Sequence, residues 1–125
     1  MPAVWYLHAQ RFRTVFREKM RELFRSVDVI LAPSTPFPAI NIGQEMIVLG
    51  GKELPSRPNI GMFTQPFSFV GLPIISVPIF EEGALPLGVQ VIGAPYQEEA
   101  ILRVARQLER SGVSKAHRPV IKAAV

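Results

Sequence analysis

The stretch Phe63–Pro95 reads FTQPFSFVGLPIISVPIFEEGALPLGVQVIGAP, and it decides how the rest of the chain can fold. An apolar helix that begins this stretch must end at Gly71–Pro73, because glycine loosens the backbone and a proline pushes the residue before it into extended geometry. The β-branched run Ile74–Ile79 and the apolar run Leu87–Ile92 then predict two buried strands. A turn at Glu81–Gly83 joins them and is too short for a crossover helix, so we expect neighbouring strands of one sheet.

Helical patterns lie on both sides of these strands. Apolar residues recur at spacings of three, four and seven from Ala3 to about Ser26, and Tyr96–Arg110 carries an apolar stripe with glutamates in its first turn. A short helix is expected from about Met62 to Val70, with its proline tolerated in the first turn. Val27–Ala32 predicts one more strand, and residues 46–54 a small hairpin around two glycines.

Together these patterns predict an α/β fold with a mixed sheet of about three strands flanked by helices. The elements occupy residues 1–112, and residues 113–125 are expected to form a flexible tail. The chain has 125 residues, of which 48% are hydrophobic and 19% charged, which suits one folded domain and argues against disorder.

Composition narrows the classes of function. The absence of cysteine excludes disulfides, thiolate metal ligands and a thiol nucleophile, and it suits a reducing, cytoplasmic location. No apolar run reaches the roughly 20 residues that a membrane span requires. The basic residues gather at residues 1–26 and 103–125. Without a combined aromatic-and-basic stripe or a recognised nucleic-acid motif, they favour solvated helix faces over a nucleic-acid surface.

A search for catalytic groups predicts none in this chain. His8 and His117 have no second ligand at metal-site spacing, so no metal and no cofactor is expected. Ser34, Ser68 and Ser76 stand in no nucleophile elbow and beside no evident base. The chain read residue by residue therefore offers no acyl-transfer site.

Three residues with amide or hydroxyl side chains remain as candidates for binding. Gln90 lies in an apolar strand, where its amide must find partners; it could face a ligand, but bridging the neighbouring backbone is favoured. Thr64 and Gln65 begin a helix beside a loop, a place that suits either a polar ligand or plain helix capping. Both interpretations of that pair stay open.

The order of these motifs resembles a known family. VILAPSTPFP, FTQPFSFVGLPIISVPI, PLGVQVIGAP and EEAILRVARQLE follow one another as in the C-terminal part of the amidase signature family. GKELPSRPNIGMFTQPFSF, at Gly51–Phe69, is similar to the carboxybiuret hydrolase branch of that family. The resemblance covers about residues 1–112.

The resemblance implies hydrolysis of an amide or urea-type C–N bond by a serine–serine–lysine relay that lies outside this sequence. It thus implies a C-terminal fragment, inactive alone, with no catalytic residue of its own. Its contribution would be one wall of a substrate site, through Asn59, Thr64 and Gln65. The implied partners are a small amide or urea-type substrate and either a second copy or the missing half, with no membrane and no nucleic acid.

Two departures from the family pattern keep alternatives in view. Ser68 stands where many relatives carry asparagine, and Gly61 stands about where the A subunits of glutamyl-tRNA(Gln) amidotransferases carry an acidic residue that contacts substrate. A fragment of such an amidotransferase protein is the first alternative. A non-catalytic interaction module that uses the basic helices is the second.

Overall fold

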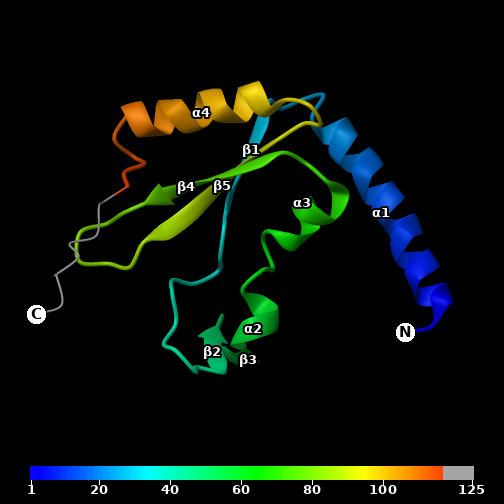
Figure 1. Cartoon of the computed structure of the whole chain (residues 1–125), viewed down its shortest axis with the longest axis horizontal. Helices are drawn as coiled ribbons and strands as arrows, with labels where there is room; N and C mark the ends of the chain where they lie inside the picture. Colours follow the sequence, from blue (N-terminus) through cyan, green and yellow to red (C-terminus); the bar gives the residue numbers. More distant parts are fainter. Residues whose placement is uncertain (117–125) are drawn as a thin grey trace, which may run out of the picture.

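A three-stranded sheet with helices on both faces, and a small hairpin beside it, form the fold in Figure 1. This is a computed structural model, and it describes residues 1–116. Among these residues no helix is both long and apolar enough to cross a membrane. In chain order the elements are α1 (Ala3–Leu23), β1 (Val29–Pro33), β2 (Met46–Leu49), β3 (Lys52–Pro55), α2 (Ser56–Asn59), α3 (Gln65–Val70), β4 (Ile74–Ile79), β5 (Leu87–Gly93) and α4 (Glu98–Arg110).

The sheet is built around its central strand, β5. The strand order is β1-β5-β4, and Gln90 of β5 lies opposite Ala32 on one side and Ser76 on the other. The predicted pairing of β4 with β5 is confirmed, as are the α/β class and the three strands. Both neighbouring pairs are antiparallel, however, so the described sheet is not the mixed sheet that the sequence pattern predicts. The strands β1 and β4 run in the same direction but never pair, because β5 separates them.

The helix ends follow local backbone chemistry. α1 ends at Leu23, three residues before the predicted end, where both the backbone N–H and the hydroxyl of Ser26 donate to the Leu23 carbonyl. α3 is shorter than predicted, and α2 precedes it as a separate turn. Gly71 ends α3 in the left-handed conformation, with φ +74°, which a residue with a Cβ rarely adopts.

The two faces of the sheet have different cover. α4 packs on one face, and its Ile101 comes so close to β5 that a Cβ on Gly93 would lie 2.7 Å from the Ile101 Cγ2 atom. Only glycine fits at that position. On the other face α1, α3 and β5 meet in a buried apolar cluster made of Met20, Val70, Leu72 and Ile92.

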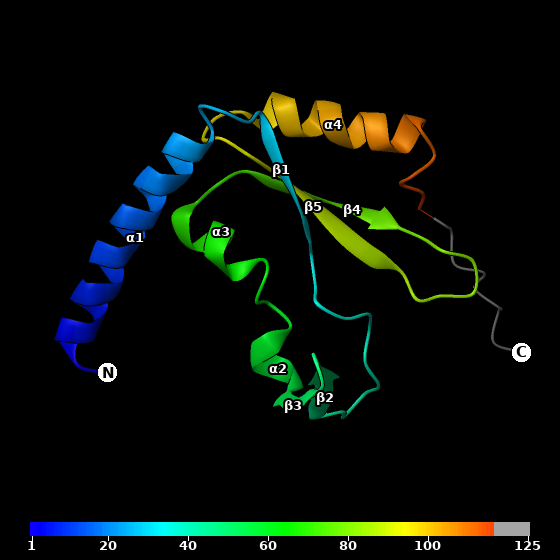
Figure 2. The same cartoon turned by 180° about the vertical axis from the view of Figure 1, so that it is seen from behind.

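The first half of α1 has no such cover among the described residues. The sequence pattern predicts one apolar stripe along the whole helix; in the structure only Met20 is buried, with Phe16 and Phe24 packed partly against the cluster. Trp5 and Phe12 are each 64% exposed. Figures 1 and 2 show why, since the N-terminal half of α1 extends away from the sheet. Within residues 1–116, only the C-terminal half of the apolar stripe is therefore covered.

The hairpin and the chain end complete the fold. β2 and β3 pair antiparallel as predicted, across Gly50 and Gly51, which both have positive φ. Beyond α4, Ser114 is buried and bridges to Ile79 at the end of β4. Residues 117–125, the greater part of the predicted flexible tail, lie outside the described residues.

We predict that replacing the buried Ile92 with alanine destabilises the chain by about 3 kcal/mol, because the change removes packed methyl groups and leaves a cavity. Ile42 is fully exposed, so Ile42→Ala serves as the matched control and should change stability by less than about 0.5 kcal/mol. Urea unfolding followed by circular dichroism measures both. Equal losses for the two variants would mean that the cluster around Ile92 is not the core.

Candidate functional site

The face of the sheet turned away from α4 carries a polar patch next to the apolar cluster. Ser76 lies opposite Gln90 across the β4–β5 ladder, so their side chains share this face. The hydroxyl of Ser34, just after β1, lies 2.8 Å from the hydroxyl of Ser76. A Cβ on Gly88 would come within 2.8 Å of the Ser34 Oγ atom, so the hydroxyl pair rests directly on the β5 backbone.

Gln90 holds this face together. Its side chain is 1% exposed, and its Nε2 atom donates to the carbonyl of Pro33 at 2.8 Å and to the carbonyl of Phe63 at 2.7 Å. The interpretation of Gln90 as a bridge to neighbouring backbone is confirmed. Its Oε1 atom is buried and accepts no hydrogen bond within residues 1–116. The bridge ties the segment that precedes α3 onto the sheet.

Asn59, Thr64 and Gln65, the predicted binding residues, lie together in that α2–α3 segment. The Asn59 Nδ2 atom donates to the Pro55 carbonyl at 2.7 Å, within α2. Thr64 is the N-cap of α3, yet its hydroxyl makes no cap hydrogen bond and instead donates to the Gly61 carbonyl at 3.2 Å. Capping in the strict sense therefore does not explain Thr64, and a binding role for the three residues stays a prediction.

Gln65 covers Gly61. A Cβ on Gly61 would lie 2.9 Å from the Gln65 Nε2 atom, so the glutamine amide occupies the space that a side chain at position 61 needs. Gln65 itself is exposed. An acidic residue at position 61 would thus require Gln65 to move, and the two positions cannot be assigned roles independently.

The described residues offer no activated nucleophile. The only hydrogen bond described for the side chains of Ser34 and Ser76 is the one that joins them, and a base is not part of it. Ser68 lies exposed on α3. Within residues 1–116 no three His, Asp or Glu side chains gather as metal ligands, and His117 is not among these residues. The polar patch can bind through hydroxyl and amide groups, but it contains no nucleophile–base pair.

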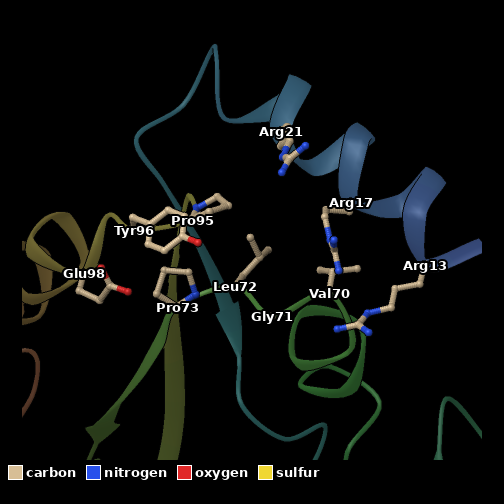
Figure 3. A pocket seen from close by; sticks show the side chains of 10 residues that line it. All are labelled: Arg13, Arg17, Arg21, Val70, Gly71, Leu72, Pro73, Pro95, Tyr96 and Glu98. Atoms are coloured by element: carbon tan, nitrogen blue, oxygen red, sulfur yellow. The ribbon is translucent and has the colours of Figure 1, made fainter. Parts of the chain in front are cut away.

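The sequence pattern did not indicate two hollows that the structure contains. The first, of about 610 Å³, lies beside β3 and α2; its lining includes Pro55, Ser56 and Arg57 but none of the predicted binding residues. The second, of about 500 Å³, lies between α1 and the β5–α4 junction and has three arginines in its wall (Figure 3). We call it the arginine cleft. The signal for it is the spacing of four between Arg13, Arg17 and Arg21.

A small antiparallel sheet with helices on both faces defines the class of the fold as α/β. The chain belongs to the amidase family, whose model matches residues 2–102. It is 44% identical over 116 residues to AtzE, a 1-carboxybiuret hydrolase protein of Pseudomonas sp. (strain ADP), in an alignment that covers 91% of this chain and 25% of that protein.

Two further comparisons agree on the family. The chain is 38% identical over 106 residues to the glutamyl-tRNA(Gln) amidotransferase A subunit of Myxococcus xanthus (strain DK1622), covering 84% of this chain and 21% of that one. A solved structure of a vestigial protein complex that reveals the evolutionary origins of an s-triazine catabolic enzyme contains a similar chain. The match has a TM-score of 0.90 and 42% identity, and covers 94% of this chain and 26% of the other. The chain thus spans about a quarter of the length of these relatives.

We predict that Gln90→Leu lowers the free energy of unfolding by about 2 kcal/mol, because it removes the two hydrogen bonds to the carbonyls of Pro33 and Phe63. Gln107, exposed on α4, provides the control: Gln107→Leu should change stability by less than about 0.5 kcal/mol. Urea unfolding measures both. A loss for Gln90→Leu no larger than for the control would show that the bridge does not stabilise the fold.

Proposed function

We propose that this chain is the C-terminal part of an amidase-family C–N hydrolase, that it supplies one wall of the substrate site, and that it hydrolyses no amide alone. The observation that carries the proposal is the 44% identity that extends over 91% of this chain but over only a quarter of the relative. The hydroxyl pair of Ser34 and Ser76 supports it, since no base activates either serine. A cytoplasmic location is part of the same proposal.

The reaction proposed for the complete domain is acyl transfer. A serine oxygen supplied from outside this sequence attacks the carbonyl carbon of an amide or urea-type group and passes its proton through the relay. The C–N bond breaks, the leaving nitrogen takes a proton, and water then hydrolyses the acyl-enzyme. In this scheme Asn59, Thr64 and Gln65 orient the substrate, because hydroxyl and amide groups can both donate to and accept from a urea-type group.

The surface of the chain supports association with the rest of such a domain. The exposed apolar side chains on the first half of α1 form a surface of the kind that takes a partner. The buried Oε1 atom of Gln90 leaves one acceptor for a donor from outside residues 1–116. For the same reasons we expect the isolated chain to self-associate, which light scattering at tens of micromolar measures.

A fragment of the amidotransferase protein is the second candidate, supported by the 38% identity to the Myxococcus relative. The residue at position 61 weighs against it, because Gly61 offers no acidic side chain where the resemblance places one in the amidotransferase A subunits. We therefore favour the hydrolase over the amidotransferase.

We predict that the purified chain releases no ammonia above the buffer rate from biuret, from carboxybiuret-like substrates or from simple aliphatic amides. Acyl transfer needs an activated nucleophile, and a site without one retains only a small part of the rate. A coupled ammonia assay measures the release. Turnover that disappears on Ser34→Ala or Ser76→Ala would show that one of these serines is a nucleophile.

A chimera provides the positive control for that assay. The part of the carboxybiuret hydrolase relative that precedes the aligned region is joined to this chain, and ammonia release should then appear. In the chimera Thr64→Ala should lower kcat/KM about tenfold if its hydroxyl orients the substrate. Thr14→Ala, on the exposed face of α1, is the matched control and should leave kcat/KM unchanged. An active chimera whose kcat/KM is unchanged by Thr64→Ala would show that Thr64 does not contact the substrate.

A further inference from the structure

We infer that the arginine cleft binds an extended acidic segment of a partner protein, one that carries carboxylates at alternate residues. The inference goes beyond the proposed function and does not depend on it, because none of Asn59, Thr64 and Gln65 lines the cleft. Figure 3 shows its two sides, with the arginines on α1 and with Tyr96 and Glu98 across from them.

The spacing of the arginines matches an extended peptide. Arg13, Arg17 and Arg21 repeat every four residues along α1, which places them in a row about 12 Å long at about 1.5 Å per residue. An extended chain rises about 3.3 Å per residue, so carboxylates at its first, third and fifth residues span about 13 Å. Each carboxylate can therefore meet one guanidinium, and arginine is well suited to that pairing.

These guanidinium groups have few strong partners within residues 1–116. Arg17 makes no hydrogen bond or ion pair within residues 1–116, and the buried Nε atom of Arg13 has no acceptor there. The guanidinium of Arg13 lies 5.7 Å from the centre of the Phe69 ring, a contact that orients it without neutralising its charge. Arg21 pairs with Glu18 at 2.7 Å, but both side chains are more than half exposed, so the pair is weak.

The C-terminus of α3 does not need the arginines either. Carbonyl groups at a helix end attract cations, which is the structural explanation for a basic row beside α3. Here the backbone N–H of Gly71 donates to Ser68, and that of Leu72 donates to Phe67. The last turn is capped by its own backbone, so the charge of Arg17 remains for a ligand.

The floor of the cleft between its two walls is apolar. Val70 and Leu72 are buried in it, and Pro73 and Pro95 lie beside them. Proline has no N–H group, so this floor presents mainly apolar surface. An extended segment whose acidic residues face α1 lies over this floor and turns its intervening residues toward the wall opposite α1, because successive side chains point to opposite sides.

The far wall distinguishes a peptide from a nucleic acid. Glu98 lies there, at the start of α4, and Tyr96 beside it is 91% exposed. A peptide that is acidic along one edge keeps its charges on the arginine side, away from Glu98. A nucleic-acid strand brings phosphates along its whole length and is repelled by this carboxylate, so the cleft favours the peptide.

The test uses the full chain and a fluorescein-labelled six-residue peptide with glutamate at its first, third and fifth positions and valine between. We expect the fluorescence anisotropy to rise on binding and the affinity to fall from about 50 to about 300 mM salt, as charges are screened. The same peptide with lysine in place of glutamate should not bind. No binding of the acidic peptide up to about 1 mM, the range of the weakest specific complexes, overturns the inference.

Variants locate the binding. Arg17→Glu should weaken the acidic peptide at least about tenfold, the change expected from losing one charge-assisted contact and gaining a repulsion. Lys19→Glu makes the same change of charge on an exposed part of α1 outside the cleft and should weaken binding less than about twofold. Equal weakening by the two variants would mean that net charge, and not the cleft, attracts the peptide.

Two further measurements guard against a variant that fails to fold. Glu98→Gln lies on the opposite wall from Arg17 and should tighten the acidic peptide about threefold by removing a repulsion; no change or a weakening contradicts the inference. A single-stranded RNA of about ten nucleotides, long enough for the arginine row, should bind more weakly than the peptide at about 150 mM salt. Tighter binding of the RNA overturns the inference in favour of a nucleic-acid site.

Discussion

The hydrogen bonds of the Gln90 amide connect three parts of the chain that are distant in sequence. Through one nitrogen, Gln90 holds the carbonyl that ends β1 and the carbonyl of Phe63, which immediately precedes Thr64 and Gln65. A buried amide is costly unless it finds such partners, so its presence in an apolar strand constrains everything around it. The place of the α2–α3 segment on the sheet follows from this one side chain.

The two faces of the sheet then take different roles. The face under α4 is closed by apolar packing so tight that Gly93 has no room for a Cβ. The other face carries both the apolar cluster and the polar patch. The α2–α3 segment and α1 lie on this side of the sheet, and the first half of α1 is uncovered. A surface divided in this way suits one part of a larger catalytic domain, in which the chemistry comes from elsewhere and this part shapes the site.

Local patterns predict much of this fold. The β4–β5 pair, the hairpin at Gly50 and Gly51 and the helix α4 were all evident, because each depends on periodicity or on turn residues that are close in sequence. The strand directions could not be predicted from such patterns, since the place of β1 beside β5 depends on contacts between residues far apart in sequence. The hydrogen bond between Gln90 and Pro33, for example, joins residues 57 positions apart. Which part of α1 this chain covers could not be predicted either, because an apolar stripe indicates a partner surface without saying whether the same residues provide it.

The candidate sites were predicted unevenly for the same reason. The bridge made by Gln90 could be anticipated from one polar residue in an apolar strand. The arginine cleft could not, because a row of arginines on a helix resembles a solvated face until α3 and the β5–α4 junction are placed opposite it. Function here depends on what folding brings together across the chain, more than on any single motif.

Side-chain amide exchange of Gln90, observed by NMR, tests the central claim most directly. If the amide nitrogen is buried and donates to two carbonyls, both of its protons should exchange with solvent far more slowly than those of the exposed Gln65 and Gln107, by about a hundredfold or more. Exchange of the Gln90 protons at the rate of the exposed glutamines would show that the bridge does not form, and would contradict the account of the fold and of the candidate site.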